Sequence, residues 1–167
     1  MCAICHSGAN SQILQPTFTY KPKDTLTKYL APVSSASIDY KHIDVHGNQR
    51  GLLATSKCFI NSNMDCSSCH DTHVNDRSNL LLYSARCMVC HNSNDHNMCK
   101  LTNQLKADFL QNNCISCHMP ELPSKLIIAG ETGALVHTHH IAVYTEETKK
   151  VLAYLKIKKT ETVTLSR

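Results

Sequence analysis

The sequence is poor in the side chains that usually build a protein core. Its 167 residues include no Trp and three Phe, and aromatic residues total 5%. No apolar run approaches the ~20 residues of a membrane span, which excludes a transmembrane helix. Five Gly and five Pro are too few for collagen-like or low-complexity sequence, and 18% charged residues are too few for a disordered charged tail. The abundant residues are instead Cys, with ten, and His, with eleven.

One pattern, Cys-x-x-Cys-His, uses eight of the ten cysteines. Its four copies begin at residues 2, 66, 87 and 114. The cysteines of the pattern are Cys2, Cys5, Cys66, Cys69, Cys87, Cys90, Cys114 and Cys117, and the histidines are His6, His70, His91 and His118. Random order of the same residues would give roughly 0.04 such motifs.

This spacing is the attachment signature of c-type haem. Two thiols three positions apart form thioethers with the two vinyl groups of one porphyrin, and the adjacent His supplies the proximal imidazole to iron. Disulfide frameworks and zinc knuckles also use cysteine pairs, but neither explains a His directly after every pair. We therefore predict four covalently attached haem c groups.

The chain resembles the multihaem c-type cytochrome superfamily. That group includes pentahaem nitrite reductases, hydroxylamine-oxidising enzymes with their tetrahaem partners, and extracellular cytochrome filaments. The resemblance covers about residues 2–140 and is carried by the four motifs, by the run from Cys69 to His73 and by the ending Cys117-His118-Met119-Pro120. It implies a mostly irregular fold with short α-helices, little β-structure and a core of closely stacked haems.

Seven further histidines are available as distal ligands for the four irons, enough for every haem to be bis-His and low-spin. On a helical turn His73 projects from the same side as His70, so we expect it to ligate a neighbouring haem. His96 lies in a polar loop that can turn its imidazole toward a haem. Between the first two motifs we favour His46 over His42.

The run His137-Thr138-His139-His140 follows the last motif. In an extended segment His137 and His139 face one way and His140 faces the other. We expect at least one of them to be a ligand, and favour His139 first and His137 second.

Cys58 and Cys99 belong to no haem motif. Because c-type haem is attached in an oxidising compartment where disulfides persist, these two thiols predict one bridge. The alternative is two buried free thiols. A disulfide that closes the loop between Cys58 and Cys99 would contribute roughly 3–4 kcal/mol to folding stability on the chain-entropy model.

Outside the haem motifs, the spacing of apolar residues and the positions of Gly and Pro predict few helices or strands. We expect an extended, haem-wrapping segment over 7–65 with one short helix near 24–30, and helices over 79–91 and 104–118 that lead into haem motifs. A hairpin is predicted over 126–136 and a helix from Thr145 to about Leu155. We expect a tetrahaem domain over 1–144 followed by a C-terminal helix and tail over 145–167.

Haem attachment requires export, so we expect a periplasmic or extracellular protein. Because Cys2 directly follows Met1 and no signal peptide precedes it, we expect the sequence to be part of a longer chain. The formal charge of +4 does not imply a nucleic-acid partner, because each ferric haem brings roughly −1.

We favour an electron carrier that works with redox partner proteins or with identical subunits in a filament. The rival hypothesis is a haem enzyme of the nitrite or hydroxylamine class, which needs one five-coordinate iron. The supply of histidines makes an open iron unnecessary, so the sequence favours the carrier and predicts no catalytic residue.

Overall fold

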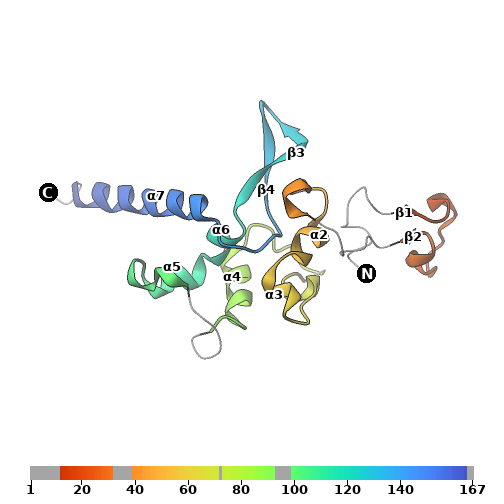
Figure 1. Ribbon diagram of the computed structural model, residues 1–167, viewed down its shortest axis with the longest axis horizontal. Coiled ribbons are helices and arrows are strands. Elements are labelled where there is room, and N and C mark those ends of the chain that lie inside the picture. The colour runs from red at the N-terminus through yellow and green to blue at the C-terminus, as the bar shows by residue number, and fades with distance from the viewer. Residues whose placement is uncertain (1–11, 32–38, 72, 93–98, 165–167) are drawn as a thin grey trace. The chain divides into compact units, whose positions relative to one another are not determined.

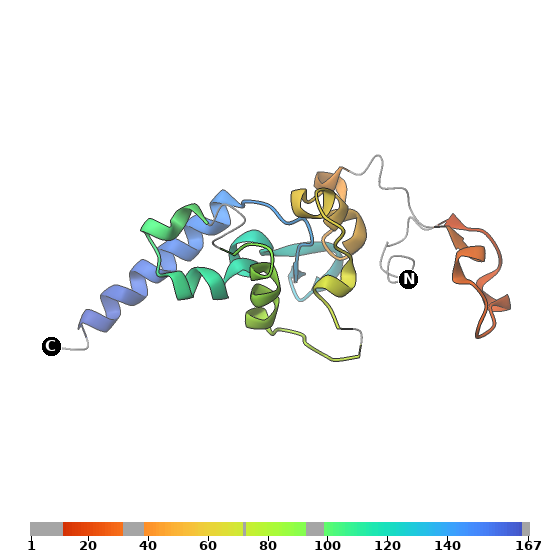
Figure 2. The same cartoon turned by 90° about the horizontal axis from the view of Figure 1, so that it is seen from below.

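The computed structural model describes residues 12–31, 39–71, 73–92 and 99–164, with side chains to residue 156 (Figures 1 and 2). It divides into two compact units, Met1–Cys66 with Glu121–Ile141 and Ser67–Pro120 with Ala142–Arg167. The described chain is mostly irregular, with short helices and two small two-stranded sheets, which confirms the predicted secondary-structure class. The domain boundary expected at residue 144 stays a prediction.

The first unit contains a small hairpin in which β1 (Gln12–Ile13) pairs antiparallel with β2 (Leu30–Ala31). Two 3-10 turns, η2 (Thr17–Thr19) and η3 (Leu26–Lys28), lie between these strands, and η3 falls within the short helix predicted near 24–30. Tyr29 is buried, packs edge-on against Tyr20 and donates its hydroxyl proton to the Asp24 carboxylate at 3.0 Å.

The second half of the first long segment contains helices that the sequence did not predict. After η4 (Tyr40–His42), the chain forms α2 (Gln49–Ala54) and α3 (Lys57–Ile60). The side-chain oxygen of Asn48 caps α2 by accepting the Gly51 N–H at 2.7 Å, and Leu52 is almost fully buried. The expectation of an extended loop is therefore wrong here, because a cap and one deeply buried side chain stabilise a helix too short to show apolar periodicity.

A longer hairpin completes the first unit. Strands β3 (Glu121–Ala129) and β4 (Thr132–His137) pair antiparallel, from Glu121 opposite His137 to Ala129 opposite Thr132. Gly130 has a φ of 67°, which allows the tight turn, and the pairing shifts register between Pro123 and Ile128. The hairpin predicted over 126–136 is confirmed and extends further at its open end.

The Asp44 carboxylate holds the irregular part of β3. It accepts the Ser124 hydroxyl at 2.9 Å, the Lys125 N–H and, from its own loop, the His46 N–H at 2.9 Å. Burial raises the pKa of the Asp44 carboxyl, but these donors outweigh burial, and the pKa lies below its ordinary value. One carboxylate thus connects the loop that carries His46 to the hairpin that leads into His137.

The second unit is helical. Its elements are η5 (Cys66–Ser68), which starts at the end of the first unit, α4 (Leu80–Met88), η6 (Lys100–Asn103), α5 (Ala107–Asn112), α6 (Cys114–His118) and α7 (Thr145–Thr164). Helix α4 packs against α5 and α6, and α6 contacts α7 (Figure 2). No helix of the described chain combines the length and apolar character of a membrane span.

Three predicted helices are found with changed ends. Asn79 caps α4 by accepting the Leu82 N–H, which confirms the start of the helix predicted over 79–91. The helix predicted over 104–118 is divided into α5 and α6 at Asn113, where φ is −127°. Helix α7 begins at Thr145 as predicted but continues past Leu155 to Thr164.

The Asp44 contacts predict a pH-dependent loss of stability in the Asp44→Asn variant. The substitution removes the charge and places an amide donor among donors, so we expect the free energy of unfolding at neutral pH to fall by about 1–2 kcal/mol. Because the folded pKa is depressed, this stabilisation is complete above the ordinary carboxyl pKa and is lost as pH falls through the folded value.

Urea unfolding followed by circular dichroism across pH measures both effects. Glu131→Gln, an equal charge change at the exposed hairpin turn, is the control and should alter stability little. Equal stabilities of Asp44→Asn and wild type, or a difference that persists at low pH, would contradict the role of this carboxylate.

Candidate haem-binding motifs

Three of the four haem motifs lie among the described residues. The first motif, with Cys2, Cys5 and His6, lies outside them, and so does His96. The other three motifs occupy η5, the end of α4 and α6.

The second motif is held against α4. The hydroxyl of Tyr83 lies 3.3 Å from Nδ1 of His70, and the two rings are 5.2 Å apart. From the next turn of the helix, the Arg86 guanidinium donates to the Cys69 carbonyl and lies 3.7 Å from the Asp76 carboxylate. Arg86 and Asp76 are mostly buried, so this pair fixes the loop after the second motif.

The third motif begins inside α4 and leaves it. The His91 N–H donates to the Cys87 carbonyl at 3.0 Å, which continues the helical turn, while Cys90 and His91 are exposed. Val89, between the two cysteines, is 74% exposed. The predicted haem-binding groups Cys90 and His91 and the apolar Val89 side chain are therefore all exposed.

The fourth motif is entirely helical. In α6, Cys114 and Cys117 are one turn apart and share a side of the helix, while Ile115 is buried. Nδ1 of His118 lies 2.9 Å from the Ala142 carbonyl oxygen, and the Ala142 N–H donates back to the His118 carbonyl at 3.2 Å.

The hydrogen bond between Nδ1 of His118 and the Ala142 carbonyl determines the tautomer of His118. A carbonyl oxygen can only accept, so Nδ1 carries the proton and donates it. Nε2 therefore keeps the lone pair that an iron ligand needs. A proximal histidine whose other ring nitrogen is fixed by a carbonyl is the arrangement expected of a metal ligand, and the fourth motif fits haem on this chemistry.

Two thiols of different motifs interact in the second unit. A hydrogen bond with Cys87 lowers the pKa of Cys114 to about 7, with a smaller contribution from Ser84 and against the effect of burial. Burial, together with the neighbouring Cys99 thiol, raises the pKa of Cys117. The pKa values of the two thiols of the fourth motif are therefore shifted in opposite directions.

The predicted distal ligands of the central region lie on exposed loops. The described residues His70, Asp71 and His73 are not assigned to a helix, so they do not show the helical turn expected to place His70 and His73 on one side. The His73 N–H donates instead to the Asp71 side chain at 2.9 Å. His46 is exposed, and Nδ1 of His42 lies 2.9 Å from the Asp39 carboxylate. The assignments of His46 and His73 as ligands stay predictions.

The C-terminal histidine run is the most tightly held of the predicted sites. Nε2 of His137 lies 3.6 Å from the Glu121 carboxylate, and the His139 carbonyl accepts the Ser56 hydroxyl at 3.3 Å. His140 is buried, its Nδ1 lies 2.7 Å from the Thr55 hydroxyl, and burial lowers its pKa. The preference for His139 stays a prediction.

The residues that hold this run were not predicted from the sequence. Thr55 and Ser56 lie more than 80 residues before their partners, and Tyr40, whose ring stacks on His140, lies still earlier. No local pattern marks such long-range partners. The sequence shows only that Thr55 and Ser56 are adjacent hydroxyl residues.

Cys58 and Cys99 are both free thiols in the structure. The disulfide predicted between them is therefore not present. Cys99 interacts with the Cys117 thiol of the fourth motif, and Cys58 lies in α3, where its carbonyl accepts the Ser62 hydroxyl at 2.7 Å.

Within the described ranges, no three His, Cys, Asp or Glu side chains are grouped as a metal-ion site. No known protein family, curated protein or solved structure matches this chain. The haem assignment therefore depends on the four motifs and on the local chemistry of their residues.

The position of Arg86 predicts that it stabilises the loop of the second motif. We expect Arg86→Met to lower the free energy of unfolding by about 1–2 kcal/mol, because the Cys69 carbonyl and the Asp76 carboxylate lose a charged donor. Hydrogen exchange should speed up over residues 69–76.

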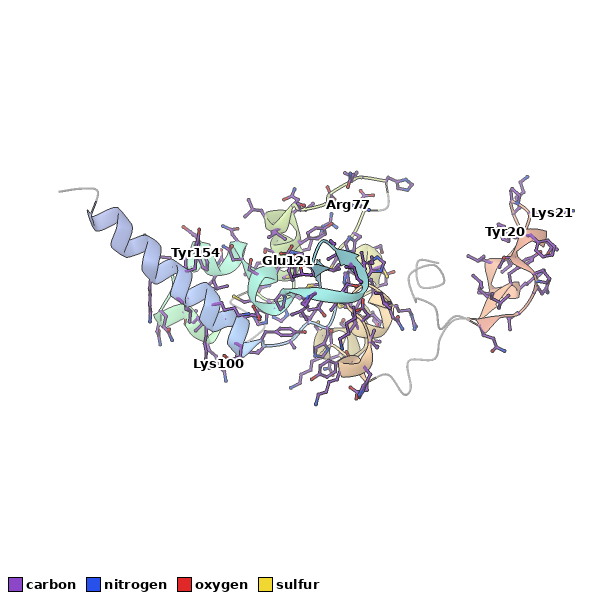
Figure 3. All side chains as sticks on the ribbon, turned by 90° about the horizontal axis from the view of Figure 1, so that it is seen from above. Tyr20, Lys21, Arg77, Lys100, Glu121 and Tyr154 are labelled. Atoms are coloured by element: carbon purple, nitrogen blue, oxygen red, sulfur yellow. The ribbon has the colours of Figure 1, made fainter. Side chains whose placement is uncertain are left out.

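Arg77→Met is the matched control, because Arg77 is exposed on the same loop (Figure 3). Equal stability and equal exchange in the two variants would show that Arg86 does not hold this loop.

Proposed function

We propose that the chain is a tetrahaem c-type cytochrome that transfers electrons. The observation that carries this proposal is the four Cys-x-x-Cys-His motifs, accompanied by seven further histidines. Eight cysteines would hold the haems through thioethers, and eight histidines would supply the axial positions. When bound, haem supplies an iron that changes between the ferric and ferrous states.

The local chemistry of the fourth motif supports this proposal. The Ala142 carbonyl holds the proton of His118 on Nδ1 and leaves Nε2 to act as the donor. A hydrogen bond at the outer nitrogen also raises the basicity of a ligand, which is one means of tuning a reduction potential. For His70, the Tyr83 hydroxyl is in a position to act on the same ring nitrogen.

The distribution of apolar side chains gives independent support. Among the described residues, the buried hydrophobic side chains are Tyr29, Val45, Leu52 and Ile115. Large apolar side chains near the motifs remain exposed, including Val89 and, beyond Ala142, Val143 at 76%. Porphyrin faces would cover apolar surface of this kind, and burial of each square ångström contributes about 25 cal/mol.

Covalent haem attachment also sets the location and the partners that we propose. The protein would be exported to the periplasm or the cell exterior, and redox proteins would be its partners. A filament of identical subunits is the more specific form of this proposal. In a filament, a neighbouring subunit would complete or abut the first haem.

Electron transfer predicts that every iron is six-coordinate. We expect the electron paramagnetic resonance spectrum of the oxidised, haem-loaded protein to contain only low-spin ferric signals, because the chain supplies two imidazoles for each iron. Exogenous cyanide should leave these signals unchanged at concentrations that saturate an open haem.

A high-spin ferric signal of about one haem per chain, abolished by cyanide, would contradict pure electron transfer. That result would favour a haem enzyme of the nitrite or hydroxylamine class.

A further inference from the structure

The three histidines of the run at 137–140 are held in different ways. His137 has its Nε2 beside the Glu121 carboxylate, at 3.6 Å. Ser56 holds His139 by its carbonyl oxygen, which fixes the backbone and leaves the ring orientation to other contacts. For His140, the structure fixes the ring itself.

The hydrogen bonds around Thr55 determine which nitrogen of His140 carries the proton. The Thr55 hydroxyl lies 2.6 Å from the Leu52 carbonyl and 2.7 Å from Nδ1 of His140. A hydroxyl has one proton, and the carbonyl can only accept. If that proton pointed to the imidazole, two oxygens would face each other at 2.6 Å with no proton between them. The hydroxyl therefore donates to Leu52 and accepts from Nδ1 of His140.

This arrangement leaves the lone pair of His140 on Nε2. It is the same tautomer that the Ala142 carbonyl imposes on His118 in the fourth motif. Metal-ligating histidines characteristically donate their other ring N–H to a fixed acceptor, which sets both the tautomer and the ring orientation.

The plane and the backbone of His140 are fixed as well. Its ring stacks on Tyr40, with centroids 3.9 Å apart and planes at 7°. Its N–H donates to the Thr138 hydroxyl at 3.2 Å. The buried Ser56 hydroxyl donates to the carbonyl of residue 139 and accepts the Ile141 N–H at 2.8 Å, so the backbone is held on both sides of His140. A ligand held at the ring, the plane and the backbone loses little entropy when it binds a metal.

We propose that His140 is the residue by which the C-terminal histidine run ligates a haem iron, and that Thr55 is its positioning residue. This inference rests on the proposed function, since it needs a haem to ligate. It replaces the sequence-based preference for His139, which was based only on the alternation of side chains in an extended segment.

Glycine variants of the three histidines test the ligand assignment in the full, haem-loaded chain. We expect His140→Gly to convert one of the four haems to a high-spin ferric form in the electron paramagnetic resonance and visible spectra. Added imidazole should restore the low-spin signal by entering the space left by the side chain. His137→Gly and His139→Gly should leave all four haems low-spin.

The haem content of each variant, measured as the pyridine haemochrome, separates the two proposals. Wild-type protein without covalent haem would overturn the proposed function itself. Four haems per chain, with the high-spin form appearing in His139→Gly or His137→Gly instead of His140→Gly, would overturn only the ligand assignment.

Substitutions of Thr55 test the positioning role and keep the inference falsifiable if His140→Gly does not fold. Thr55→Val keeps the side-chain shape and removes the acceptor, so we expect shifted low-spin g-values and a more positive potential for one haem. Thr55→Ser should restore the wild-type values, and Thr132→Val, on the exposed face of β4, should not change them. Identical spectra and potentials in Thr55→Val and wild type would overturn the proposal.

Discussion

A shortage of apolar burial governs this structure. Among the described residues only four hydrophobic side chains are buried, and several large ones beside the haem motifs are exposed. A chain with so little core of its own needs another source of stability, and covalently attached cofactors with large flat apolar faces would supply it. The short helices and the scarcity of strands follow from the same shortage, because long regular elements need an apolar face to bury.

Single polar side chains hold the irregular segments together. Asp44 binds the bulged part of β3, Ser56 binds the backbone on either side of His140, and Arg86 binds the Cys69 carbonyl. Each of these residues satisfies backbone groups that neither a helix nor a sheet would satisfy. All three act on segments that carry histidines or haem motifs, so the same contacts that stabilise the loops also position the candidate ligands.

The sequence predicted those features that depend on neighbours in the chain. The start of the helix predicted over 79–91, the hairpin over 126–136 and the start of α7 at Thr145 depend on local signals, and the structure confirms all three. Helices α2 and α3 were missed because they are too short to show periodicity. The contacts of Asp44 with Ser124 and of Thr55 with His140 connect residues at least 80 positions apart, and no local pattern marks them. Haem binding by the Cys-x-x-Cys-His motifs stays a prediction, which depends on their spacing.

Covalent binding of haem by the cysteine pairs can be tested by measuring the intact mass of the denatured protein. After export with the haem-attachment machinery, we expect the polypeptide mass plus four haems, and plus three haems for the variant with Cys114 and Cys117 both replaced by Ala. Cys58→Ser should retain all four haems. A mass equal to the bare polypeptide, or the loss of every haem on denaturation, would contradict the account.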